Sequence, residues 1–366
     1  MSELITTLGN RKPLRWRLLG TVSALAFAAM IAEANAEDSS HPTLWIELGG
    51  QLQHMGDGQD PYMPPFTKAI SDAGLPSPAS NQHAPLYSIA GEGKISLMPE
   101  GSNWVFSAGI RYGRSSGGRD SYKSAAFTAP FIGQTRTGYH YVDIDPTYHE
   151  SHTIVDFQAG KDIGLGLFGH NGVSTVSLGV RVAQFSSKAS VKVNSDPDDV
   201  FDLGYLTGLG SLPLGAHNHA YHGQSESERS FTGVGPSIEW DGSAAVLGSP
   251  ERGEVTFDWG ANAAILFGRQ KANVHEKTTP YYLKTFFGNG ALTTGDPTLR
   301  TSIRSRSVVV PNLGGFAGLS MKFPNAKVGF GYRVDYFFGA MDQGGDARHT
   351  ADMIFHGPFA SISIGF

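Results

Sequence analysis

The chain contains no cysteine, so disulfide bonds cannot hold a small, loop-rich fold together. After residue 36 it also lacks any apolar run approaching the roughly 20 residues that a membrane-spanning helix needs. Acidic residues outnumber basic ones, and the formal net charge of −5 gives no basic footprint for a nucleic-acid partner. Membrane strands are not excluded, because their alternating residues average to a weak hydropathy signal.

The first 36 residues have the three parts of a secretory signal peptide. Residues 11–17 hold four basic side chains, a short apolar stretch follows, and Ala-Asn-Ala at 34–36 forms a cleavage site. A membrane anchor is the alternative, but the apolar stretch is short and Glu33 interrupts it. We therefore expect a signal peptide at 1–36 and one exported domain at 37–366.

Ten segments of that domain alternate apolar and polar residues, with the period of two that marks a β-strand. In the C-terminal "GPFASISIGF", Ile362, Ile364 and Phe366 share one face, while Ser361 and Ser363 lie on the other. Most of the segments reach the roughly 9–11 residues that a tilted transmembrane strand requires. The predicted strands are 44–53, 86–98, 103–114, 151–163, 174–187, 229–241, 254–269, 308–322, 327–339 and 354–366.

The connections between these segments alternate between short and long, as in bacterial outer-membrane barrels. We predict an all-β fold, a transmembrane antiparallel β-barrel of about ten strands with short periplasmic turns and long extracellular loops. A soluble β-sandwich also alternates, but it would seldom need five long loops. Segments 137–143 and 281–287 either extend hairpins above the membrane or add a pair of strands, which would make twelve. The short connections are 98–103, 164–173, 242–253 and 323–326, and the long ones are 55–85, 115–150, 188–228, 270–307 and 340–353.

Charged residues of the strands fall on one parity, opposite the apolar face. A basic side chain facing lipid at mid-depth costs about 2–4 kcal/mol, so this parity is expected to face the barrel interior. These ten residues are the predicted pore lining: Glu47, Glu92, Lys94, Arg111, Asp156, Arg181, Glu239, Asp258, Arg333 and Asp335. They form either a narrow aqueous channel or a salt-bridged plug, and the many small inward residues favour the channel.

Aromatic residues recur at strand ends on the apolar parity, where a girdle at the headgroup level belongs. The predicted girdle is Tyr87, Trp104, Tyr112, Trp240, Tyr336 and Phe366. The expected partners are outer-membrane lipid and lipopolysaccharide. A terminal aromatic such as Phe366 also resembles the assembly signal of outer-membrane barrels, which implies a contact with the barrel-assembly machinery. The expected location is the outer membrane of a Gram-negative bacterium.

Three consecutive stretches between residues 174 and 275 carry a family resemblance. They are "TVSLGVRVAQFSS", "SFTGVGPSIEWDGS" and "WGANAAILFGRQKANV". The matching residues are Val180, Arg181 and Val182; Phe231, Gly233, Gly235 and Pro236; and Phe267, Gly268 and Arg269. The chain thus resembles the Legionella-type major outer-membrane proteins, which implies a porin-like, pore-forming role. It departs from them in lacking the cysteines that the best-known members use for cross-linking.

The function predicted from the sequence is a narrow pore for small hydrophilic solutes or ions. The alternatives are a surface adhesin or structural barrel with a plugged lumen and, further off, an outer-membrane protease or lipase. Asp143, Asp145 and His149 lie in one predicted outer loop, but no second acid–histidine cluster completes a proteolytic site. We therefore expect no catalytic residue and no enzyme activity.

The remaining motifs indicate no cofactor and no metal. "GRSSG" at 113–117 lacks the strand-to-helix turn of a nucleophile elbow, and "GLGLFG" at 164–169 precedes a strand, not the helix that a dinucleotide site requires. His217, His219 and His222, and the acidic stretch at 196–202, are expected to be solvated loop residues.

Overall fold

The computed structural model describes residues 43–57, 88–116, 126–131, 134–139, 143–163, 173–195, 217–249, 252–286, 289–294, 298–342 and 350–366. In this part of the chain no helix is long and apolar enough to cross a bilayer. The strands are β1 (Leu44–Asp57), β2 (Ser88–Leu97), β3 (Trp104–Ser116), β4 (Ala126–Phe131), β5 (Gln134–Tyr139), β6 (Asp143–Asp162), β7 (Val173–Ser195), β8 (His217–Ser249), β9 (Gly253–Phe286), β10 (Asn289–Thr294), β11 (Thr298–Phe323), β12 (Ala326–Asp342) and β13 (Thr350–Gly365).

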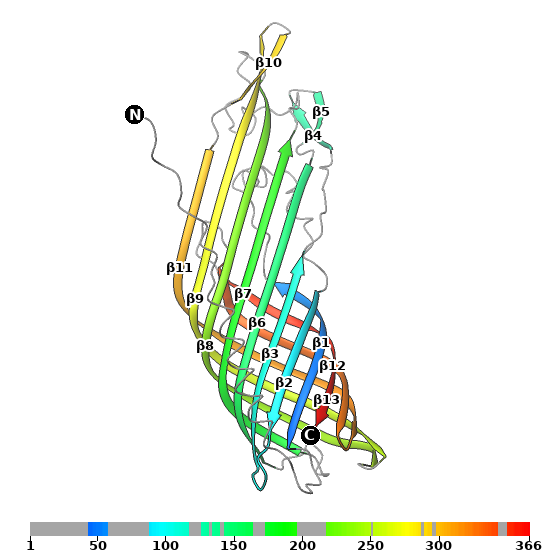
Figure 1. Ribbon diagram of the computed structural model, residues 1–366. Helices are drawn as coiled ribbons and strands as arrows, with labels where there is room; N and C mark the ends of the chain where they lie inside the picture. Colours follow the sequence, from blue (N-terminus) through cyan, green and yellow to red (C-terminus); the bar gives the residue numbers. More distant parts are fainter. Residues whose placement is uncertain are drawn as a thin grey trace, which may run out of the picture. The chain divides into compact units, whose positions relative to one another are not determined.

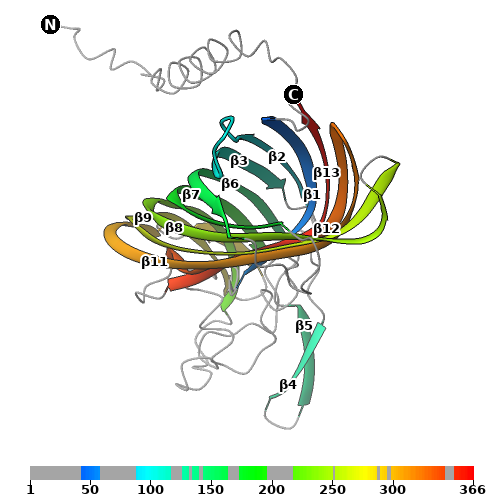
Figure 2. The ribbon, with the colours of Figure 1, turned by 90° about the horizontal axis from the view of Figure 1, so that it is seen from below.

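Ten of these strands close into one antiparallel barrel, which confirms the predicted fold (Figures 1 and 2). The ring runs β1-β2-β3-β6-β7-β8-β9-β11-β12-β13, and β13 pairs with β1 to complete it. β9 pairs with both β8 and β11, so every strand of the ring has a neighbour on each side. β10 pairs with the end of β9, and β4 with β5 forms a separate hairpin.

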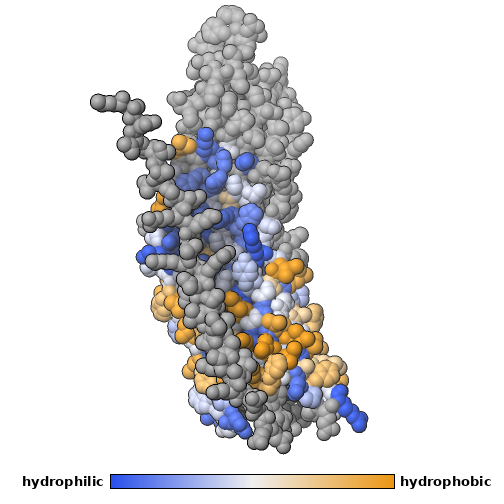
Figure 3. Space-filling view, in the orientation of Figure 1, coloured by the Kyte–Doolittle hydropathy of each residue, from blue (hydrophilic) through white to orange (hydrophobic). Residues whose placement is uncertain are grey.

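The outer face of the barrel is apolar over a limited height. In the space-filling view, hydrophobic residues gather over the lower part of the described surface (Figure 3). One row of paired residues marks the upper limit: Val234, Phe267 and Val309 lie side by side on β8, β9 and β11. The next outward row is Thr232, Arg269 and Ser307, which belongs in the headgroup region or beyond. This apolar outer belt around a charged interior identifies a membrane-spanning barrel of the outer-membrane kind.

Five strands are much longer than the sequence pattern predicted. β6, β7, β8, β9 and β11 contain 20, 23, 33, 34 and 26 residues, against the roughly 9–11 that a crossing requires. The expectation of loops over much of 115–150, 188–228 and 270–307 is therefore wrong, and the turn expected at 242–253 is shorter because β8 continues to Ser249. These extensions carry polar residues on both faces, so they have no apolar alternation to reveal them.

The alternative of twelve strands is wrong. Residues 281–286 continue β9 and pair with β10, and 134–139 pair with β4, so both lie in hairpins outside the ring. We call the polar parts of β6 to β9 and β11, beyond the row of Val234, Phe267 and Val309, the outer extension.

Candidate functional site: the barrel lumen

All ten residues predicted to line a pore lie inside the barrel. Nine of them line a cavity with a volume of about 280 Å³, and Asp335 lines a smaller one beside it. Alternation along each strand places them there, because one parity of every strand must face the enclosed axis. Their placement does not test conduction, so a role as a pore lining stays a prediction.

Two arginines join the middle of the lumen into one polar network. Arg181 Nε lies 2.6 Å from Asp156 Oδ1, and Arg181 Nη1 donates to Asn262 Oδ1 at 2.6 Å and also to Asn312. Arg111 pairs with Asp335 and lies 3.9 Å from Asp156. Arg181 is only 1% exposed, so its charge depends on these partners and not on water. The network thereby ties β3, β6, β7, β9, β11 and β12 together across the interior.

A third arginine is fixed by both charge and aromatic rings. Arg333 on β12 pairs with Glu92 on β2, through two nitrogens of its guanidinium group. Its guanidinium carbon lies 5.5 Å from the ring centroid of Phe316 and 4.9 Å from that of Phe359. Cation–π contacts of this kind add to the ion pair. The side chain is held in place and does not hang free in a channel.

The end of the lumen near the short turns has an acidic surplus. Lys94 Nζ lies 3.8 Å from Glu239 and 3.7 Å from Asp241, and Lys327 Nζ lies 2.9 Å from Asp258. Asp258 also accepts hydrogen bonds from Ser243 and Ser320. Glu47 accepts one from Ser363 at 3.1 Å. Four acids thus share this end with two lysines.

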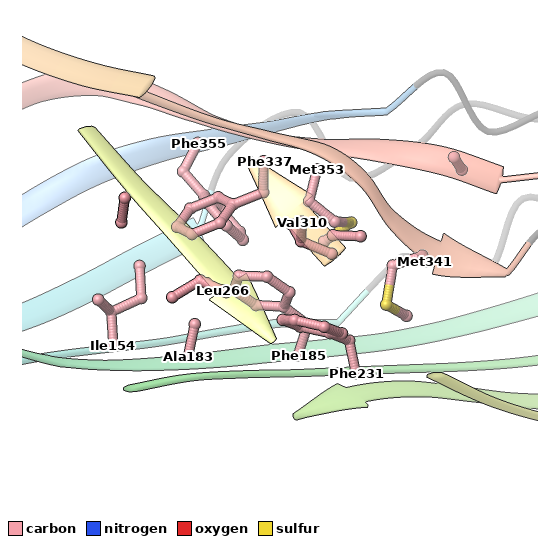
Figure 4. Packing of buried hydrophobic residues seen from close by; sticks show 13 residues of the cluster. Ile154, Ala183, Phe185, Phe231, Leu266, Val310, Phe337, Met341, Met353 and Phe355 are labelled. Carbon is pink, nitrogen blue, oxygen red and sulfur yellow. The ribbon is translucent and has the colours of Figure 1, made fainter. Parts of the chain in front are cut away.

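Above the ionic network, toward the outer extension, buried apolar side chains pack together inside the barrel (Figure 4). The rings of Phe185 and Phe337 are 4.8 Å apart between centroids, and those of Phe185 and Phe355 are 5.4 Å apart. Phe185, Phe231 and Phe337 have no exposed surface. The apolar cluster consists of Ile154, Ala183, Phe185, Phe231, Ala264, Leu266, Val310, Phe337, Ala340, Met341, Ala351, Met353 and Phe355. Packed apolar side chains offer water and ions no hydrogen-bonding partner.

Three features of this site were not predicted from the sequence. Asp241 and Lys327 lie on the same parity as Glu239 and Arg333, at the ends of predicted strands, so the alternation could have found them. Phe316 lies in a weakly patterned strand. The apolar cluster was missed because apolar residues were assigned to the lipid face, although Phe185 and Phe337 have the parity of the charged residues.

The predicted girdle residues lie on the outer surface where they are described. Trp104, Tyr112, Trp240 and Phe366 are exposed. Tyr336 is half-buried beside Phe338, and the centroids of the two rings are 4.2 Å apart. Tyr87 lies outside the described residues. A girdle in contact with headgroups remains a prediction, since no lipid is present.

The motifs set aside in the sequence show no cofactor geometry where they are described. Gly113 to Ser116 form the extended end of β3. His149 is exposed on β6, and the side chains of Asp143, Asp145, His217, His219 and His222 lie outside the described residues, as do 164–169 and 196–202. Among the described side chains, no group of three or more acids and histidines could hold a metal ion.

No family model matches the sequence. A search of curated proteins also finds no match. The resemblance to the Legionella-type proteins is therefore untested and stays a prediction.

Solved structures with a similar arrangement are outer-membrane barrels. Outer membrane protease OmpT from Escherichia coli is 10% identical with a TM-score of 0.43, covering 91% of this chain and 99% of that one. The toluene transporter TodX from P. putida is 9% identical with a TM-score of 0.26, covering 90% and 91%. The transport unit of the autotransporter AIDA-I from Escherichia coli is 10% identical with a TM-score of 0.17, covering 95% and 97%. The activities in these names, proteolysis and transport, belong to those proteins.

Proposed function

We propose that this chain is an outer-membrane barrel with a closed lumen, which holds a long β-sheet above the membrane and presents it to partners at the cell surface. The apolar cluster is the observation that carries the proposal, because its buried rings pack together inside the barrel near the level where the outer apolar belt ends. The ionic network beneath it supports the same reading, since ion pairs join its acids and bases across the interior. Such an interior stabilises the barrel without offering a continuous aqueous path.

The experiment compares conductance with attachment. Full-length protein refolded into planar bilayers is expected to give no steady ion current. Cells that display the protein are expected to bind a target surface, and to lose that binding when residues 279–297 at the tip of the extension are replaced by Asn-Gly. Heat-modifiable migration in gels serves as the control that the shortened barrel still folds. Steady current through the wild-type barrel would overturn the closed lumen, and unchanged attachment would overturn the surface role.

The second candidate is the narrow, porin-like pore that the family resemblance implies. One observation favours it, the charged cavity of about 280 Å³ below the apolar cluster. Four acids against two lysines at that end predict a weak preference for cations, lessened in Asp258→Asn or Glu239→Gln. This candidate requires the apolar cluster to move aside, so current would come in gated bursts.

Neither proposal assigns a reaction to the chain. Peptide and lipid cleavage assays on wild-type protein and on His149→Ala test this directly. If the wild-type protein cleaves a peptide and His149→Ala does not, the chain is a protease after all.

A further inference from the structure

One edge of the outer extension has no strand beside it within the described part of the chain. β11 pairs with β12 only from Asn312 to Phe323, whereas its pairing with β9 continues up to Thr298. Among the described residues, 298–311 therefore have a ladder partner on one side alone. Pro311, which has no N–H to donate, lies where the second ladder stops, a position typical of proline at a sheet edge.

The edge is open because β12 bends away from it. The register of β12 with β13 shifts between Phe337 and Met341, and Gly339 has φ +61°, a conformation that favours glycine. The end of β12 then lies against the inner face of the sheet, where Gln270 Nε2 donates to the carbonyl of Gly339 at 2.6 Å. An ion pair of 2.7 Å between Arg304 and Asp342 fixes the same bend.

The outer face of this edge carries two exposed apolar side chains among polar neighbours. Leu299 and Ile303 are 72% and 71% exposed, well beyond the row that ends the membrane belt. Their partners across the ladder on β9 are Lys277 and Asn273. Neither lipid nor the described protein covers the two side chains, so they are suited to contact a further strand.

Arg306 places on the inner face of the edge a positive charge that no described carboxylate pairs with. Arg306 Nε donates to Gln270 Oε1 at 2.7 Å, while its Nη2 is buried and has no hydrogen-bond partner among the described residues. Arg306 also forms no ion pair in this part of the chain, unlike Arg304. A buried guanidinium N–H without an acceptor is costly, and a carboxylate satisfies both its charge and its geometry.

From this combination we propose that the edge at residues 298–311 binds an acidic, extended segment of a partner protein as an added β-strand. Backbone hydrogen bonds to the free edge supply affinity. A carboxylate on the inner face pairs with Arg306, and β-branched residues on the outer face pack against Leu299 and Ile303. The proposal rests on the surface role proposed above and names the part of the extension that makes the contact.

Two alternatives fit this edge less well than a partner's strand does: pairing with the same edge of a second copy, and an edge built to prevent pairing. Antiparallel pairing with a second copy about a two-fold axis at Ser305 would set Arg304 opposite the second copy's Arg306, and like charges directly opposite are destabilising. Inward charges can also guard an edge against pairing, but a guarded edge has no need of exposed Leu299 and Ile303.

The test uses full-length protein refolded in detergent and a labelled synthetic peptide in which Glu alternates with Val. Fluorescence anisotropy is expected to show binding, and a peptide with Gln in place of Glu should bind much more weakly. Arg306→Gln should weaken binding of the Glu peptide about tenfold, the loss expected for one charge-assisted hydrogen bond. Arg269→Gln removes the same charge from the outer face of β9 and should leave binding unchanged.

Hydrogen exchange locates the contact. Peptide binding should slow exchange at amides of residues 298–311. Equal binding of the two peptides, no effect of Arg306→Gln, or protection elsewhere would overturn the proposal. The proposal would also be overturned if the wild-type protein sedimented as a dimer and the Ile303→Lys variant as a monomer. A barrel that conducts but still binds the peptide would refute only the closed lumen, so the two failures can be told apart.

Discussion

The ionic network and the apolar cluster both point into the barrel, yet they occupy its interior by opposite means. In the network, each charge needs a partner on another strand, and the cavity between them leaves room for water. In the apolar cluster, the rings pack against one another and exclude water. Ten strands enclose a space that side chains can fill, so the choice of residue at each height decides whether that space is wet or dry.

The largest expected effect comes from breaking the network at its most buried charge. Arg181→Met should lower the free energy of unfolding by about 4 kcal/mol. The change leaves Asp156 with Arg111 as its one basic neighbour among the described residues and removes the hydrogen bonds that Arg181 donates to Asn262 and Asn312. Denaturant titration in detergent, followed by heat-modifiable migration, measures the loss. A loss below about 1 kcal/mol would mean that water already screens this arginine.

The next effect probes the apolar cluster. Phe185→Ala should cost about 3 kcal/mol, because it leaves a cavity against Phe231, Phe337 and Phe355. Phe330→Ala, on the lipid-facing side of β12, is the matched control and should cost much less. If both changes cost the same, the cluster is no better packed than the lipid surface. Phe185→Ala should also admit ions more readily than wild type.

A smaller effect is expected at the end of the network near the short turns. Lys327→Gln should cost about 1 kcal/mol, because the side chain of Lys327 is 30% exposed and its pair with Asp258 is partly screened. The loss should shrink as salt is added, whereas that of Arg181→Met should not. Equal salt dependence would show that the two ends of the network have the same access to water.

The smallest effect lies in the outer extension. Leu299→Ser should change the free energy of unfolding by less than about 0.5 kcal/mol, since the side chain is exposed and covers nothing described. A large loss in the same denaturant titration would mean that a part of the chain outside the described residues packs on it.

Alternation predicted the ten membrane strands and the inward direction of all ten charged residues, because a single-residue shift would turn every charge toward lipid. It did not predict the outer extension, where stretches such as Ser225 to Glu228 are polar on both faces and only the ladder with β7 and β9 makes them strands. It also missed the apolar cluster, because apolar residues were assigned to the lipid face although Phe185 and Phe337 have the parity of the charged residues. Which apolar residues meet inside is a property of the closed ring.

The most direct test is single-channel recording in planar bilayers with wild-type protein and with Phe185→Ala combined with Phe231→Ala. A closed lumen predicts no steady current from wild type and measurable current from the double variant. Steady current from the wild-type barrel, unchanged in the variant, would contradict it.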